Sequence, residues 1–203
     1  MQNWKRQAVL FLSSQGVSMF GSSIVQYAIM WHLTLTTQSG LMMTFYIICG
    51  FLPTFFLSPF AGVWADRYNR KKLIIGADGG IAIATLILAI LFLSGIQHIW
   101  LLFIVVTIRA IGAGIQTPAV GAVLPQIVPE EKLMRVNGIN GTIQSMIFFG
   151  APLISAALLS ITTLEMILFV DVVTALIAIV IMFFLKLKHV KNETASSGYL
   201  ADF

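Results

Sequence analysis

Charge is scarce in this sequence, and its scarcity excludes most classes of soluble protein. Only 10% of the 203 residues are charged, whereas about a quarter are charged in an ordinary soluble domain. Hydrophobic residues make up 58% of the chain, which indicates an integral membrane protein in contact with the lipid bilayer. The formal net charge of +4 would suggest nucleic acid as a partner of a soluble protein. Because the basic residues here flank apolar runs, a membrane topology explains them, and we expect no nucleic-acid partner.

Cysteine and histidine are also few, which argues against metal and redox chemistry. Cys49 is the single cysteine, so the chain has no disulfide within it and no cysteine-based metal cluster. His32, His98 and His189 are too scattered to suggest a set of ligands. The sequence also lacks the His-Glu-x-x-His and Gly-x-Ser-x-Gly patterns of hydrolases. We therefore expect no metal, no cofactor and no enzymatic activity.

Long apolar runs dominate what is present. Each has roughly the 20 residues that an α-helix needs to cross a hydrocarbon core of about 30 Å. The sequence therefore predicts an all-α integral membrane protein with six transmembrane helices, forming one bundle over residues 1–186. Residues 187–203 turn polar and are predicted to be a flexible cytoplasmic linker or tail. The approximate spans are 9–33, 42–63, 73–93, 99–120, 139–161 and 164–185.

Lysine and arginine alternate between the ends of these runs. All 12 of them except Arg109 lie at the N-terminus, in the second and fourth loops or in the tail. The first, third and fifth loops contain none. By the positive-inside rule, both termini are predicted to face the cytoplasm.

Four polar residues form a stripe in the first predicted helix. Their steps of three and four residues place them on one helical face, and polar side chains are costly in lipid. Two interpretations remain open: the stripe bonds to neighbouring helices and lets them pack closely, or it lines a water-filled cavity. The residues are Gln15, Ser18, Ser22 and Gln26.

Arg109 lies near the centre of the fourth predicted helix, where a guanidinium needs a partner or water. Gln116 lies on the same helical face. Asp78 and Asp171, in the third and sixth helices, are candidates to compensate the charge. Either acid could titrate with protons or be a permanent ion-pair partner of the arginine.

Glycine and proline interrupt two of the predicted helices. The second contains Gly50 and Pro53, and the fifth contains Gly150-Ala151-Pro152 after the polar residues Asn140 and Gln144. If the six helices form two inverted sets of three, the second helix corresponds to the fifth. Paired interruptions in corresponding helices favour moving elements of a secondary transporter.

The charged stretch between the second and third runs carries the most specific pattern. Gly62-Val63-Trp64-Ala65-Asp66-Arg67-Tyr68-Asn69-Arg70-Lys71 resembles the major facilitator superfamily signature G-x-L-A-D-R-x-G-R-K. Trp64 replaces the leucine, and Asn69 replaces the second glycine as a residue that tolerates a left-handed turn. Arg109–Gly114 resembles the superfamily's helix 4 motif. Over its length the chain is most similar to the N-terminal half of bacterial macrolide-efflux-type exporters.

This resemblance implies a fold and a mechanism. The fold would be the N-terminal bundle of a major facilitator, a 3+3 inverted repeat in a bacterial cell membrane. The activity would be proton-coupled efflux of a small amphipathic, macrolide-like compound. Gly62, Asp66, Arg67, Arg70 and Lys71 would form a cytoplasmic gate in which Asp66 meets a second bundle. The intramembrane charges would exchange partners as protons enter; they are Asp78, Arg109 and Asp171. The hinges of the helices would be Gly50, Pro53, Gly150 and Pro152. The substrate cavity would be lined by Gln15, Ser18, Ser22, Gln26, Gln116, Asn140 and Gln144.

The length of the chain does not fit a whole transporter of this type. The superfamily needs about twelve helices, and the sequence stops at Phe203 after six predicted spans. We expect a fragment that does not transport alone, with either the missing half or another copy as the second six-helix bundle. The alternative is a non-transporting six-helix membrane subunit or an inactive truncated transporter.

Overall fold

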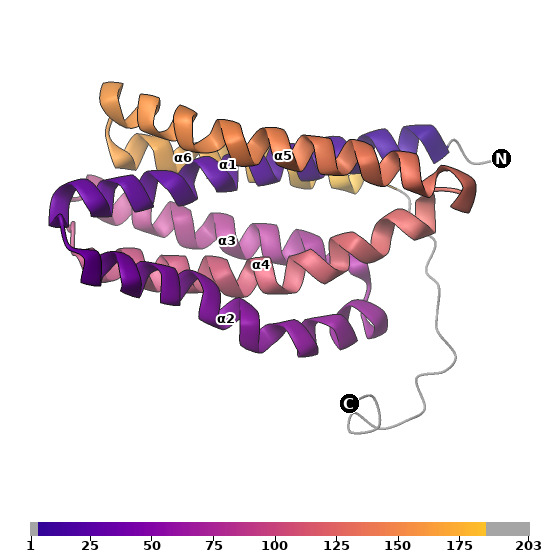
Figure 1. The fold of residues 1–203 in the computed structure, drawn as a ribbon, viewed down its shortest axis with the longest axis horizontal. Coiled ribbons are helices and arrows are strands. Elements are labelled where there is room, and N and C mark those ends of the chain that lie inside the picture. Colours follow the sequence, from indigo (N-terminus) through magenta and orange to yellow (C-terminus); the bar gives the residue numbers. More distant parts are fainter. Residues whose placement is uncertain (1–3, 186–203) are drawn as a thin grey trace.

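The computed structural model describes residues 4–185, which form six α-helices and no strand (Figure 1). Each helix is long and apolar enough to cross a membrane. The predicted all-α fold with six spans is thereby confirmed. The helices are α1 (Trp4–Thr37), α2 (Gly40–Arg67), α3 (Arg70–Leu93), α4 (Ile99–Ile127), α5 (Glu130–Ile161) and α6 (Leu164–Phe183).

Several helices extend beyond the apolar runs. The first begins at Trp4 rather than near residue 9, and the fifth begins at Glu130 rather than near 139. Hydropathy marks only the part of a helix that lies in hydrocarbon, whereas backbone hydrogen bonding continues into the polar interface. Glu130 and Glu131 also favour a helix start, because acidic side chains stabilise the positive end of the helix dipole. The predicted tail, 187–203, lies outside the described residues.

The contacts between helices have an internal twofold pseudo-symmetry that relates the first three helices to the last three. The first packs against α5 and α6, and α4 packs against α2 and α3, while α3 and α6 pack against each other. Exchanging α1 with α4, α2 with α5 and α3 with α6 reproduces these contacts, as expected for two inverted sets of three. Figure 1 shows α2 and α5 on opposite sides of the bundle. The predicted 3+3 arrangement thus has a direct counterpart in the packing.

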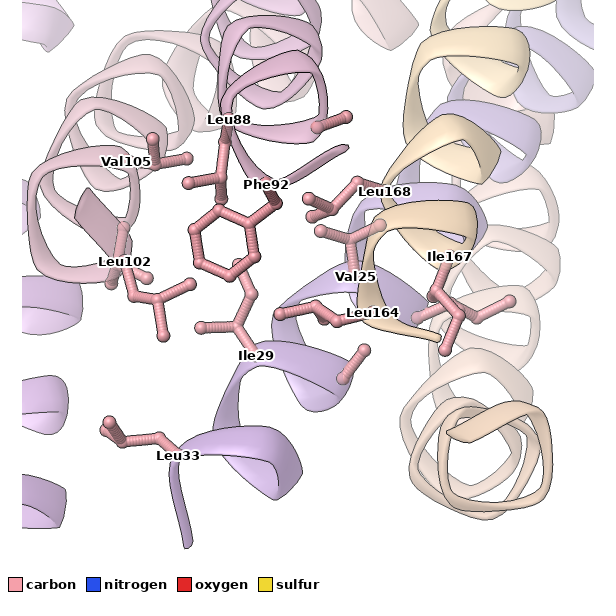
Figure 2. Packing of buried hydrophobic residues seen from close by; sticks show 14 of the residues in the cluster. Val25, Ile29, Leu33, Leu88, Phe92, Leu102, Val105, Leu164, Ile167 and Leu168 are labelled. Carbon is pink, nitrogen blue, oxygen red and sulfur yellow. The ribbon is translucent and has the colours of Figure 1, made fainter. Parts of the chain in front are cut away.

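Two apolar clusters make up the core, one towards each end of the bundle. At the end where α1 meets α2, Phe92 packs among Leu88, Leu102 and Ile29, and residues of α6 complete the cluster (Figure 2). At the other end, Phe11, Ile74 and neighbouring residues of α4 and α6 form the second cluster. We call this second end the basic end, because it holds the start of α1 and the α2–α3 and α4–α5 connections with their lysines and arginines. Between the two clusters lies a polar layer.

Candidate functional site

The polar layer is built from side chains that are almost fully buried. Such groups are usually hydrogen-bonded in lipid-spanning helices, because an unpaired polar group in hydrocarbon costs several kcal/mol. Helices α1, α3, α4 and α6 supply its hydrogen-bonded side chains, and α5 adds Ser155. The buried polar residues are Ser14, Gln15, Ser18, Asp78, Thr85, Arg109, Ser155 and Asp171.

Arg109 of α4 forms a buried ion pair with Asp171 of α6. Nη1 of Arg109 donates to Oδ2 of Asp171, and the two residues are 5% and 1% exposed. Thr85 of α3 accepts from Nη1 of Arg109 at 2.6 Å and donates to Oδ2 of Asp171 at 2.9 Å. Ser22 of α1 donates its hydroxyl to Oδ1 of Asp171 at 2.7 Å, and its carbonyl accepts from Nη2 of Arg109 at 2.9 Å. This ion-pair group joins four helices.

Asp78 of α3 belongs to a second group that contains no cation. Ser18 of α1 donates to Oδ1 of Asp78 at 2.6 Å, and Nε2 of Gln116 in α4 donates to the same oxygen at 2.9 Å. Gln116 also lies 3.5 Å from Oε1 of Gln15. Of the two acids that could compensate Arg109, the structure pairs it with Asp171 and leaves Asp78 with neutral donors.

The stripe on α1 divides between these groups. Gln15 and Ser18 are buried and contact the Asp78 group, while Ser22 is half-buried and contacts Asp171. Gln26 is half-buried beside α2, where its backbone carbonyl accepts a hydrogen bond from the Tyr46 hydroxyl at 2.7 Å. The side chains of Gln15, Ser18 and Ser22 thus bond to neighbouring helices, as the packing interpretation expects, whereas Gln26 does so through its backbone.

The polar residues of α5 lie elsewhere. Asn140 is half-buried and Gln144 is exposed on the surface of the bundle, and neither takes part in the hydrogen bonds of the polar layer. An exposed glutamine in an apolar helix is costly against lipid, so this face of α5 requires water or another protein surface. The predicted cavity residues are thus not one cluster.

Sequence reasoning missed Thr85. Its hydroxyl touches both members of the ion pair. The signal was its spacing, because Thr85 lies seven residues after Asp78 and so on the same face of α3. Threonine is common in apolar helices, where its hydroxyl usually bonds to its own backbone, and its hydroxyl here also lies 2.9 Å from the Ile81 carbonyl.

The segment that resembles the superfamily signature, residues 62–71, lies at the basic end and hydrogen-bonds the ends of neighbouring helices. Arg70 donates from Nε to the Ala65 carbonyl at 2.9 Å and from Nη1 to the Ala122 carbonyl at 2.8 Å, so it links α2 to α4. Its Nη2 lies 3.2 Å from Oδ1 of Asp66. Lys71 donates to the carbonyls of Phe183 and Leu185 at 3.0 and 2.8 Å and so satisfies the C-terminus of α6.

Asp66 is an exposed member of this segment. Its side chain is 69% exposed, although Arg70 fixes one of its oxygens. A Cβ built on Gly62 would meet no atom within 4 Å, so no neighbour in this bundle requires glycine there. Arg67 is half-buried and takes part in an interaction of its own. The segment thus holds Asp66 at the surface of the basic end.

The expectation that Asn69 provides a left-handed turn is wrong. Asn69 has a φ of −65° and does not adopt the left-handed conformation. It is the N-cap of α3, where its side-chain oxygen accepts from the Lys72 backbone N–H at 3.3 Å. Asparagine is among the preferred N-cap residues because its side chain satisfies an amide that the helix leaves unpaired.

The glycine and proline interruptions lie inside continuous helices. Pro53 lies within α2 and Pro152 within α5. Figure 1 shows α2 changing direction part-way along its length, as expected where proline removes a backbone hydrogen bond. A Cβ built on Gly50 would lie 3.5 Å from Val106 of α4, an ordinary contact, and Gly150 has similar space. Among residues 4–185, no group of three or more His, Cys, Asp or Glu is placed to hold a metal ion.

Residues 8–199 match the sequence model of the Major Facilitator Superfamily. The chain belongs to the major facilitator superfamily. It is therefore a multi-pass membrane protein of a transporter family and not an enzyme, as predicted.

Relatives within the superfamily include named efflux proteins. The chain is 39% identical to macrolide efflux protein A of Streptococcus pyogenes over 176 residues, which are 87% of this chain and 44% of that protein. It is 36% identical to macrolide efflux protein A of Enterococcus faecalis over 73% of this chain and 46% of that protein. A staphyloferrin A transporter of Staphylococcus aureus is 23% identical over 94% of this chain and 48% of its own length. The chain thus spans about half the length of the curated relatives it matches.

Proposed function

We propose that this chain forms the N-terminal six-helix half of an exporter that moves an amphipathic, macrolide-like compound out of a bacterial cell in exchange for protons. The similarity to macrolide efflux protein A across 87% of the chain carries this proposal. The buried charges of the polar layer support it, because ionisable groups inside a membrane protein are expensive and most often serve transport.

The second bundle would cover α2 and α5. Of α2, only Tyr46, Ala61 and Ala65 are buried, although the helix is long and apolar. The fifth helix exposes Gln144 within its apolar length, which favours a protein-lined, hydrated surface over lipid. We place the substrate cavity along this face, with Asn140 and Gln144 on its wall and the half-buried Gln26 at its α1 side. Gly50, Pro53, Gly150 and Pro152 would let α2 and α5 bend as the cavity opens.

An accumulation assay tests this function. The chain is expressed in a macrolide-sensitive bacterium, either alone or together with the remaining, C-terminal part of macrolide efflux protein A from Streptococcus pyogenes. We expect reduced accumulation of a radiolabelled macrolide only when both parts are present, and recovery of accumulation when an uncoupler collapses the proton gradient. Reduced accumulation by the chain alone would contradict the half-transporter, and uncoupler-insensitive export would contradict proton coupling.

The exposed carboxylate of Asp66 would close the gate at the basic end, which we place on the cytoplasmic side together with both termini. Arg70 orients it at 3.2 Å, and Lys71 and Arg70 hold the surrounding helix ends in place. The open space beside Gly62 would admit a helix of the second bundle. Asp66 would accept hydrogen bonds from that helix and stabilise the outward-open state.

Asp66→Asn is expected to slow export by a factor of about ten or more when the chain is co-expressed with the C-terminal part of macrolide efflux protein A. The reason is that one charge-assisted hydrogen bond contributes about 1.5–3 kcal/mol. The measurement is the initial rate of macrolide efflux at equal membrane content of both parts. Glu131→Gln, which removes another exposed carboxylate at the basic end, is the matched control and should leave the rate unchanged. Equal rates for Asp66→Asn and wild type would rule out the gate role.

A further inference from the structure

We propose that Asp78 is the acid that takes up and releases the proton, and that Asp171 stays ionised throughout as the counter-ion of Arg109. This inference deepens the proposed proton-coupled export by assigning different roles to the two buried acids. It follows from how the hydrogen-bond donors are distributed between them.

Both carboxylate oxygens of Asp171 accept hydrogen bonds, and one of the donors is a cation. Oδ1 accepts from Ser22, and Oδ2 accepts from Thr85 and from the Arg109 guanidinium. Donors on both oxygens, one of them a cation, stabilise the ionised form of a carboxylate. Protonating it would also leave Arg109 as an unpaired charge that is 5% exposed. Asp171 is therefore a fixed counter-ion.

Asp78 has a one-sided environment. Both of its donors, Ser18 and Gln116, reach Oδ1, and within residues 4–185 no group donates to Oδ2. The side chain is nevertheless only 4% exposed. This arrangement fits a neutral carboxylic acid, whose carbonyl oxygen accepts hydrogen bonds while the other oxygen carries the proton.

The charges on the surrounding helices do not compensate Asp78. The cation of α4, Arg109, is bonded to Asp171, and Gln116 is neutral. On α3 itself, Lys71 lies two turns towards the basic end and donates to carbonyls of α6. The other charged side chains on α3, and on the helices in contact with α3 or with Ser18, lie at helix ends: Lys5 and Arg6 on α1, Asp66 and Arg67 on α2, Arg70 and Lys72 on α3, and Glu165 on α6. The further titratable residues on these helices are Tyr27 and His32 on α1 and Tyr46 and Cys49 on α2.

Charge balance then selects the protonated form. With both acids ionised, the polar layer would carry two negative charges and one positive charge, and a net charge in a low-dielectric layer is costly. A proton on Asp78 makes the layer neutral. On uptake, a protonated water molecule gives its proton to Oδ2, so that one of its O–H bonds breaks as the O–H bond of the carboxyl forms. On release that bond breaks and the proton returns to water. Ser18 and Gln116 remain on Oδ1 in both states, so the ion pair with Arg109 need not break.

Infrared spectroscopy of the purified 203-residue chain in lipid vesicles tests the assignment. The readout is the C=O stretch of a protonated carboxyl at neutral pH. We expect the band in the wild-type chain, its loss in Asp78→Asn, and its persistence in Asp66→Asn and in the double variant Arg109→Gln/Asp171→Asn. The double variant removes Asp171 without leaving Arg109 unpaired, so it should insert and fold.

A second measurement separates the acids by stability. Because asparagine resembles a neutral aspartic acid, Asp78→Asn should keep the thermal unfolding midpoint of the wild type, whereas Asp171→Asn should lower it. A band that survives in Asp78→Asn, or that is missing from the wild type, would overturn the assignment, as would a large loss of stability in Asp78→Asn. The readouts require no transport, so failure of the accumulation assay would be distinguishable from failure of this proposal.

Discussion

Replacing Asp171 with asparagine is expected to lower the free energy of unfolding by about 3–5 kcal/mol, because it leaves a buried arginine without its counter-ion. Arg109 would lose its only acidic partner among residues 4–185. Thr85 and the Ser22 carbonyl would still accept hydrogen bonds from it, but neither carries charge. The measurement is reversible unfolding of the purified chain in detergent, followed by loss of helicity.

Two variants control this experiment. Asp66→Asn removes an exposed carboxylate whose ion pair with Arg70 contributes at most about 1 kcal/mol, so its effect should be small. The double variant Arg109→Gln/Asp171→Asn removes both buried charges and should recover part of the loss, because no uncompensated charge remains. If Asp171→Asn unfolded like the wild type, the ion pair would not stabilise the bundle.

Gly21→Ala is expected to destabilise the bundle by about 1–3 kcal/mol, because the added methyl group overlaps α6. A Cβ at Gly21 would lie 1.8 Å from Oγ1 and 2.7 Å from Cβ of Thr174. The overlapping atoms sit on a short, branched side chain that bonds to its own helix, with Oγ1 2.8 Å from the Val170 carbonyl. The helices would have to separate. Small residues at membrane helix contacts allow this close approach. Unfolding in detergent measures the effect.

The same substitution elsewhere provides the control. Gly76 is exposed on α3, and a Cβ there meets no atom within 4 Å, so Gly76→Ala should be neutral or slightly stabilising. Adding Thr174→Gly to Gly21→Ala should restore part of the lost stability, because it removes both overlapping atoms. Equal stability of Gly21→Ala and Gly76→Ala would contradict the close packing of α1 on α6.

Much of the fold could be predicted because membrane insertion depends on local sequence. Hydropathy located the six helices, although it missed the first turns of α1 and α5, where helical structure continues past the apolar part. The spacing of Gly62, Asp66 and Arg70 pointed to the superfamily that the match over residues 8–199 confirms. The stripe on α1 followed from helical periodicity alone. None of these inferences required knowledge of which helices are neighbours.

The partners across helices were decided only by the tertiary structure. The sequence offered Asp78 and Asp171 as equal candidates for the ion-pair partner of Arg109. The rotation and packing of α3, α4 and α6 place Asp171 in that position. The same packing joined Thr85 to that pair and left Asp78 with neutral donors. Composition and periodicity fix the membrane helices and their polar faces, because those depend on neighbours along the chain. Which buried charges meet depends on side chains far apart in sequence, so only the packed bundle separates a permanent ion pair from an acid without a counter-ion.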